Sequence, residues 1–398
     1  MIPVAEAQAR ILAKLRPVGT ETVSLAEAWG RVLADPVLAR RTQPPGDVSA
    51  MDGYALRAAD AGPWTVIGSA PAGHPFAGSV GPDQTVRVFT GSLIPEDADA
   101  VVIQEDADQD GDVLTVREAP RLRAHIRPGG GDFREGERLL EAGTVLGARA
   151  IGLVAAANCP WVAVRRRPRV AILATGDEIA LPGDPVGPGG IVSSNAHALA
   201  ALTRSAGATP VVLPIARDSA EVIAATADQL GGIDLLVTTG GASVGEHDLI
   251  QEGLGARGFA LDFWQIAMRP GKPLLFGELA GTPVLGLPGN PVSALVCGVL
   301  FLLPAIARLS GQRNGGLPVE TATLAVPVKA NDHRADHLRA RLERDSAGAL
   351  LATPFERQDS SLLRLLAEAQ ALVLRPPHAP PAPAGTPVPI IRLDGGLL

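Results

Sequence analysis

The stretch "DLLVTTGGASVGEHDLI", residues 234–250, decides the fold. A run of β-prone aliphatic and threonine residues ends at Gly240 and Gly241, a loop of small residues follows, and acidic residues then open a helical segment. A strand that passes through a glycine loop into a helix is typical of an open α/β sheet. Glycines let backbone N–H groups approach a ligand, and the start of a helix favours an anion. We therefore interpret this loop as a cradle for an anion such as phosphate.

The same alternation of strands and helices extends over residues 169–311. The segments "RVAILATG", "TPVVLPI", "KPLLFGEL" and "TPVLGLPG" are predicted strands. Helices are predicted at "SNAHALAALTRSAG", where Ser194 or Asn195 is the expected cap, at "SAEVIAATADQLGG", and in the apolar run from Asn290. Strands that alternate with helices of about 10–15 residues predict a doubly wound parallel sheet.

The pattern changes on both sides of this region. Residues 2–16 and 22–34 have the apolar spacing of packing helices, and short strands between turn clusters predict a mostly-β insertion. The fold class is therefore multidomain α/β plus β. The predicted domains are a discontinuous helical linker region (1–43 and 137–168), an inserted mostly-β domain (44–136), a central α/β domain with a doubly wound parallel sheet (169–311) and a small C-terminal β domain (312–398).

Composition excludes several classes of protein. Of the 398 residues 46% are hydrophobic, so the chain can bury real cores and is not disordered. Only 3% are aromatic and the formal charge is −7, which argues against a nucleic-acid partner. Cys159 and Cys297 lie far apart in apolar surroundings and are predicted to be buried thiols, not a disulfide or part of a zinc site.

Targeting signals are not expected. Glu6, Arg10 and Lys14 interrupt the stretch where a signal peptide needs apolar residues. The longest apolar run, residues 292–307, contains Pro304 and is too short to cross a bilayer. We expect a soluble cytoplasmic protein without a membrane partner.

Four predicted strand ends carry unusual turns, and ligands of an open parallel sheet bind beyond the carboxyl ends of its strands. The turns are "ATGDE" (174–178), "TTGGASVG" (238–245), "RPGKP" (269–273) and "LPGNP" (287–291). A single glycine turn is as often structural as functional, but four together indicate a site. The candidate ligand-binding groups without charge are Thr175, Gly240, Gly241, Ser243, Gly245, Asn290 at the N-cap of the last helix, and Ser293.

Charged residues accompany these turns. Arg269 and Lys272 are candidate cations for an oxyanion. Carboxylates beside a phosphate site make sense when a divalent metal such as Mg²⁺ bridges them, which makes Glu178, Asp218 and Asp248 candidate metal ligands. The structural alternative for each acid is a solvated carboxylate at the start of a helix.

Six motifs, in one order over nearly the whole chain, resemble the molybdopterin molybdenumtransferase (MoeA-type) family, which includes the E domain of gephyrin. They are "SAMDGYA", "VFTGSLIPEDADAVV" (with Asp97 in place of a glycine), "ATGDEI", "TTGGASVGEHD", "RPGKP" and "LPGNPVSA". The resemblance implies insertion of molybdate into adenylylated molybdopterin, with Mg²⁺ as cofactor and release of AMP. It also implies an elongated homodimer of four-domain subunits.

The resemblance also implies roles for particular residues. Asp52, Glu178 and Asp248 would be catalytic, and residues of the inserted domain would reach into the partner subunit's cleft. The implied residues of that domain are Asp52, Thr90, Arg127 and Asp132, and the implied oxyanion ligands are Arg269, Lys272, Ser293 and either Arg339 or Arg341. This chain departs from the family at Gln265 and Arg269, where many members have lysine, and at Ser360-Ser361, where the family has "SG".

Two other functions compete with this one. Residues 169–311 also resemble an ATP-dependent molybdopterin adenylyltransferase, but that family is not expected to have "SAMDGYA" or the C-terminal domain, and its loop is usually closer to "GGTG". The third possibility is a dimeric scaffold that binds a partner protein, as gephyrin does. Other proteins of molybdenum cofactor biosynthesis are further candidate partners.

Overall fold

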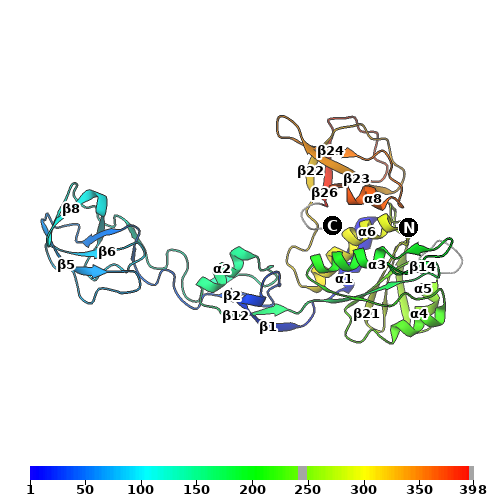
Figure 1. The fold of residues 1–398 in the computed structure, drawn as a ribbon, viewed down its shortest axis with the longest axis horizontal. Helices are drawn as coiled ribbons and strands as arrows, with labels where there is room; N and C mark the ends of the chain where they lie inside the picture. Colours follow the sequence, from blue (N-terminus) through cyan, green and yellow to red (C-terminus); the bar gives the residue numbers. More distant parts are fainter. Residues whose placement is uncertain (241–248, 394–398) are drawn as a thin grey trace.

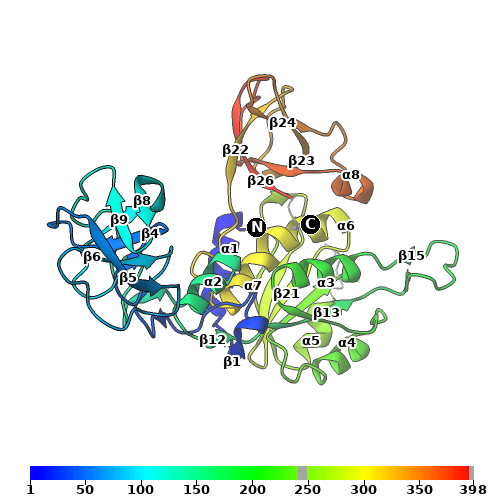
Figure 2. The same ribbon diagram turned by 60° about the vertical axis from the view of Figure 1, so that its left-hand side comes forward.

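The computed structural model describes residues 1–240 and 249–393. The molecule is elongated (Figure 1): an inserted β domain lies at one end, a small linker region in the middle, and the central α/β and C-terminal domains at the other end. Figure 2 shows the same arrangement after a turn, with the C-terminal domain above the helices of the central domain. The multidomain architecture predicted from the sequence is confirmed, whereas the predicted domain boundaries remain predictions.

The central sheet has six strands in the order β16 (Thr209–Val212), β13 (Arg169–Ala174), β17 (Leu235–Thr239), β21 (Thr282–Leu287), β20 (Leu275–Leu279) and β18 (Phe259–Trp264). The first four are parallel, and β20 and β18 extend the sheet in antiparallel fashion. The sheet is therefore mixed, with an antiparallel edge added to the parallel strands that the sequence predicted. The reason is the two-residue connection of β20 to β21, in which Ala280 and Gly281 have φ of 48° and 86°. Positive φ at both positions makes a tight hairpin, while a parallel connection needs about a dozen residues.

Helices cover both faces of the sheet, as a doubly wound fold requires. Val170 and Ile172 of β13 point to a core shared with α1 (Val4–Lys14), α3 (Asn195–Ser205), α6 (Pro291–Cys297) and α7 (Leu303–Leu309). Ala171 and Leu173 point to the opposite core, below α4 (Ala220–Ala227) and α5 (Leu249–Gly255). This alternation follows from the two-residue period of a strand.

The continuous helical segment Pro291–Leu309 has the length and apolar composition of a membrane span, but its most apolar window is 94% buried inside the molecule. It is therefore the core helix of the central domain. Cys297 in this segment and Cys159 in the linker region are both buried and unpaired, as predicted.

The linker region contains fewer helices than predicted. Residues 22–34 do not form a helix: they begin inside β1 (Thr20–Ser24), which pairs with β12 (Trp161–Arg165), and continue through a 3₁₀ turn, Leu25–Glu27. The β-branched residues of "TETVS" suit a strand, and the pairing partner lies far away in sequence, so tertiary pairing overrides the local apolar spacing. The region also contains β2 (Val37–Leu38), β11 (Arg138–Leu140) and α2 (Ala148–Ala156).

Two β domains complete the chain. The inserted domain has the sheet β7 (Ala100–Ile103), β4 (Gly53–Leu56), β6 (Gln84–Val88), β5 (Trp64–Ala70), β9 (Val113–Val116) and β8 (Ala107–Asp110), with β3 (Val48–Ser49) paired to β10 (Ile126–Arg127). The C-terminal domain closes on itself through β23 (Ala335–Arg344), β24 (Leu350–Pro354), β22 (Glu320–Leu324), β26 (Pro387–Arg392) and β25 (Ala371–Arg375), because β23 also pairs with β25. The short strand β19 (Met268–Arg269) of the "RPGKP" turn joins this sheet beside β23.

Candidate functional site

A cavity of about 780 Å³ lies at the carboxyl ends of β13, β17 and β21. This is the position where ligands bind in an open α/β sheet. All four unusual turns contribute residues to it, although the turn of residues 269–273 contributes only Pro273. The sequence-predicted residues that line the cavity are Thr175, Glu178, Asp218, Gly240, Asn290 and Ser293.

The floor of the cavity depends on the absence of a side chain at Gly240. Its φ is +95°, and a Cβ atom there would lie 2.3 Å from the carbonyl oxygen of Thr175. No other residue fits this position without moving the backbone. A Cβ atom at Gly289 would lie 3.5 Å from the Cα atom of Gly240, so the second and fourth turns are in close contact.

Asn195, at the start of α3, connects two of these turns. Its side-chain amide donates to Thr239 Oγ1 at 2.9 Å and to the carbonyl oxygen of Gly289 at 2.8 Å. The sequence suggested only a capping role for Asn195, and nothing in a single sequence indicates these distant acceptors. Asn290 occupies the N-cap position before Pro291, as predicted, but its side chain makes no capping hydrogen bond. Its amide therefore remains available to a ligand at the cavity wall.

The cavity offers oxygen atoms for a divalent cation. Glu178 and Asp218 both line it, and the buried hydroxyl of Thr175 has no hydrogen-bond partner among the described residues. These oxygen donors suit Mg²⁺, which usually binds through one or two carboxylates together with water and substrate phosphates. Within the described residues no group of three His, Cys, Asp or Glu side chains forms a metal site. Asp248, Gly241, Ser243 and Gly245 lie outside the described residues.

The predicted cations differ in their surroundings. Lys272 is half-buried beside Pro273, and its ammonium group has no ion pair or hydrogen bond to a described residue. The guanidinium of Arg269 instead binds Asp336 through two bonds of 2.9 Å. Neither side chain is part of the cavity lining.

Arg339 of β23 is fully buried, at 0% exposure. Its Nε donates to Gln358 Oε1 at 3.2 Å, but neither of its Nη atoms has a partner in the described part of the chain. Burial lowers the pKa of the guanidinium, and the nearby charge of Asp359 opposes this effect. A buried cation with two unused donors is expensive unless an anion completes it. Arg341, the alternative on the same strand, is exposed and bound to Glu368.

The predicted residues of the inserted domain lie in two places. The backbone N–H and the hydroxyl of Thr90 donate to Asp52 at 2.7 and 2.9 Å, and these bonds lower the pKa of Asp52. Arg127 and Asp132 line a separate pocket of about 740 Å³ in the inserted domain. This domain lies at the far end of the molecule from the α/β domain (Figure 1), so these residues do not reach the cavity of their own chain.

Known protein families match the chain over nearly its full length. Residues 2–158 match the MoeA N-terminal region (domain I and II), residues 171–308 match a probable molybdopterin binding domain, and residues 321–393 match the MoeA C-terminal region (domain IV).

Individual relatives agree with these matches. Molybdopterin molybdenumtransferase 2 of Mycobacterium tuberculosis is 33% identical over 400 residues, covering 97% of this chain and 98% of the relative. Molybdopterin molybdenumtransferase of a Nostoc species is 38% identical over 312 residues, covering 75% and 72%. Among solved structures, the molybdopterin biosynthesis moeA protein of Pyrococcus horikoshii OT3 is similar with a TM-score of 0.86, at 27% identity, over 98% of this chain and all of that chain (100%).

Proposed function

The chain belongs to the MoeA family, whose relatives are named molybdopterin molybdenumtransferases of molybdenum cofactor biosynthesis, and we propose that it inserts molybdate into adenylylated molybdopterin and releases AMP. The observation that carries this proposal is the cavity at the sheet's carboxyl ends, where glycine turns, two carboxylates and polar groups converge. The reaction takes place in the cytoplasm, on a homodimer.

The glycine turns bind the phosphates of the substrate. Gly240 allows the backbone to approach a bound group closely, and the helix that begins at Pro291 presents the N–H and the buried hydroxyl of Ser293, while the N–H of Val292 donates to the carbonyl oxygen of Ser360 at 3.2 Å. Unpaired N–H groups at the start of a helix attract anions. Asn195 supports this arrangement because it ties the ends of two turns together.

Glu178 and Asp218 would hold Mg²⁺ together with Asp248. The donor set supports this assignment because both described carboxylates line the same cavity as the unpartnered Thr175 hydroxyl. The chemistry that Mg²⁺ would supply there is polarisation of the phosphoanhydride. Glu178 and Asp218 would orient the ion, and the glycine turns around them keep the phosphates of the substrate in place.

Lys272, Ser293 and Arg339 bind molybdate. Molybdate is a dianion and the adenylate is also anionic, so local cations are needed to bring the two together. The free ammonium of Lys272 and the two unpartnered Nη atoms of Arg339 supply donors that no described protein group uses.

Asp52, Thr90, Arg127 and Asp132 act on the cavity of the partner subunit. The elongated shape supports this assignment, because the inserted domain extends away from its own α/β domain and carries its polar loops with it (Figure 1). Asp52 is suited to a charged role, since the bonds from Thr90 keep it ionised.

The product distinguishes the candidate functions. Protein is incubated with adenylylated molybdopterin, Mg²⁺ and molybdate, or with molybdopterin, Mg²⁺ and ATP, while AMP, pyrophosphate and activation of a cofactor-free molybdoenzyme are followed. AMP release that requires molybdate is the expected result. Pyrophosphate release from ATP would instead identify an adenylyltransferase. A folded dimer that forms product in neither reaction would favour a scaffold function.

The dimer has its own test. Light scattering at micromolar concentration is expected to give twice the 40.9 kDa mass of one chain. A stable monomer with full transfer activity would contradict the assignment of inserted-domain residues to the partner's cavity.

A further inference from the structure

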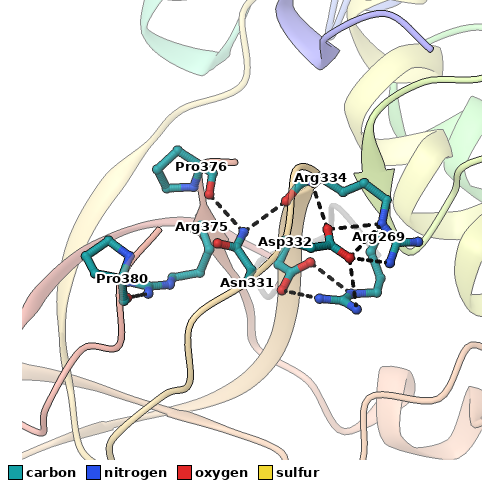
Figure 3. A network of polar contacts seen from close by, with 8 residues as sticks. Arg269, Asn331, Asp332, Arg334, Arg375, Pro376 and Pro380 are labelled. Carbon is teal, nitrogen blue, oxygen red and sulfur yellow. Dashed lines mark hydrogen bonds and ion pairs between the residues drawn. The ribbon is translucent and has the colours of Figure 1, made fainter. Parts of the chain in front are cut away.

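Arg269 lies in a cluster of charged residues between the central and C-terminal domains, which we call the Arg269 cluster. It consists of Arg269, Asp332 and Arg334, which are labelled in Figure 3, together with Asp336, which pairs with Arg269. Arg269 makes two bonds of 2.9 Å to Asp336, and its Nη1 lies 3.9 Å from Asp332 Oδ2. Arg334 holds the other side of Asp332, with a closest bond of 2.6 Å. Two cations and two carboxylates therefore neutralise one another.

The Arg269 cluster reinforces a junction of two strands. Met268 and Arg269 of β19 are in register with Ala335 and Asp336 of β23, although β19 belongs to the segment that forms the central domain. The turn after β19 packs on the core helix, since a Cβ atom at Gly271 would lie 2.5 Å from Cys297 Sγ. The cluster thus fixes the C-terminal domain to a turn that is itself anchored in the central domain.

The charges of the cluster make Arg269 a poor ligand for an external anion. The side chain of Asp336 is only 9% exposed, while that of Arg269 is 48% exposed. An anion that took the guanidinium would leave a buried carboxylate without its partner, which costs much more than losing an exposed ion pair. The two parallel bonds also require the planar fork of arginine, which a lysine lacks.

On the basis of the proposed function, we propose that Arg269 is a positioning residue, which acts with Asp336 to hold β23 against the turn of residues 269–273 and does not contact molybdate. Arg339 lies three residues after Asp336 on β23, at a distance of about 10 Å along the strand. The same junction therefore sets where the unpartnered Nη atoms of Arg339 lie relative to Lys272. We therefore expect specificity for the oxyanion to depend on the spacing between Lys272 of the central domain and Arg339 of the C-terminal domain.

Asp336→Asn gives opposite results for the two roles of Arg269. If Arg269 binds the anion, removal of the competing carboxylate strengthens binding, and the KM for molybdate falls or stays unchanged. If Arg269 is a positioning residue, the KM for molybdate rises about tenfold or more, as is typical when a group that orients a ligand residue is lost. The KM for the adenylylated pterin is expected to stay within about twofold, because the glycine turns remain intact.

Arg269→Lys supplies a second comparison. It keeps the charge but cannot form the two parallel bonds, so a positioning role predicts the same rise in the KM for molybdate as Asp336→Asn. An anion-binding role predicts a KM close to that of the unmodified protein. Asp228→Asn is the matched control, because it breaks the exposed 2.8 Å pair of Asp228 with Arg257 away from the cavity; it is expected to change neither KM.

Hydrogen exchange of the substrate-free protein separates the inference from the proposed function. Both variants are expected to lower amide protection in β19 and the first half of β23, while the control leaves it unchanged. Unaltered protection in both variants would overturn the positioning role, whatever the enzyme does. Loss of protection in a protein that never releases AMP would leave the junction in place and reject the proposed function instead.

Discussion

Arg339→Met removes a buried charge but keeps much of the apolar length of the side chain. It tests whether the guanidinium is retained for anion binding at a cost in stability. In the substrate-free protein, neither Nη atom has a hydrogen-bond partner within the described residues. A buried polar group without a partner costs about 1–3 kcal/mol.

The stabilising interaction that Arg339→Met removes is weak. Methionine gives up the 3.2 Å bond from Nε to Gln358, which is worth about 1 kcal/mol. Gln358 stays satisfied, because its oxygen still accepts from the backbone N–H of residue 339 at 3.0 Å and its amide still donates to the carbonyls of residues 339 and 355. We expect the free energy of unfolding to rise by about 0–2 kcal/mol, the difference between these two contributions. Transfer of molybdenum is expected to fall about tenfold to a hundredfold, the value of a lost charge-assisted bond.

Urea denaturation followed by circular dichroism measures the stability, and hydrogen exchange in β23 shows whether the gain is local. Arg341→Met is the matched control: Arg341 is exposed, pairs with Glu368 and lies 5.2 Å from the Phe355 ring centroid. Its loss should cost at most about 1 kcal/mol and leave transfer unchanged. A loss of more than about 2 kcal/mol in Arg339→Met, or full transfer, would refute the reasoning.

Three further predictions concern Gly240 at the cavity, the buried His337 and the two buried cysteines. Gly240→Ala should lower the free energy of unfolding by about 2–4 kcal/mol, because the new Cβ atom strains the backbone and overlaps the carbonyl oxygen of Thr175. The control is Gly152→Ala in the interior of α2, where a Cβ atom meets nothing within 4 Å. It should raise the free energy of unfolding by about 0.5–1 kcal/mol in the same denaturation series. Burial lowers the pKa of His337 to about 4. As the pH falls, the unfolded chain therefore protonates this histidine before the folded protein does, and stability is lost. Between about pH 6.5 and pH 4, the free energy of unfolding should drop by about 3 kcal/mol more in the unmodified protein than in His337→Gln. Burial raises the pKa of the Cys297 thiol far above its usual range, so a maleimide at neutral pH should label neither Cys297 nor Cys159 until urea is added, and labelling of the native protein would contradict their burial.

The sequence predicted those parts of the fold that depend on local patterns. The alternation of strands and helices identified both covered faces of the central sheet, and the glycine turns marked the strand ends that line the cavity. It failed at residues 22–34, where a strand depends on β12 far along the chain. It also missed the reversal of β20, although the two residues 280–281 between the strands are the length of a hairpin.

Candidate site residues were also predictable where they depend on local sequence and hidden where they depend on distant contacts. Thr175, Glu178, Asp218, Gly240, Asn290 and Ser293 were predictable because they flank strand ends, and they share one cavity. Asn195 was recognised only as a cap, since its acceptors lie 44 and 94 residues away. The engagement of Arg269 by Asp336 was equally hidden, because strand pairing between two domains brings them together.

The buried helix of residues 291–309 has a consequence for how the chain is made. Its apolar surface would attract a lipid bilayer or other unfolded chains if it were exposed during synthesis. All six strands of the sheet that it covers precede it in the sequence, as does α1, which packs beside it. The segment therefore leaves the ribosome after most of its docking surface, and we expect it to be largely buried before the C-terminal domain, which adds Leu366 and Ala369 to the same core, is synthesised. The order of elements along the chain thus shortens the time in which the most insoluble part of the nascent protein needs a chaperone.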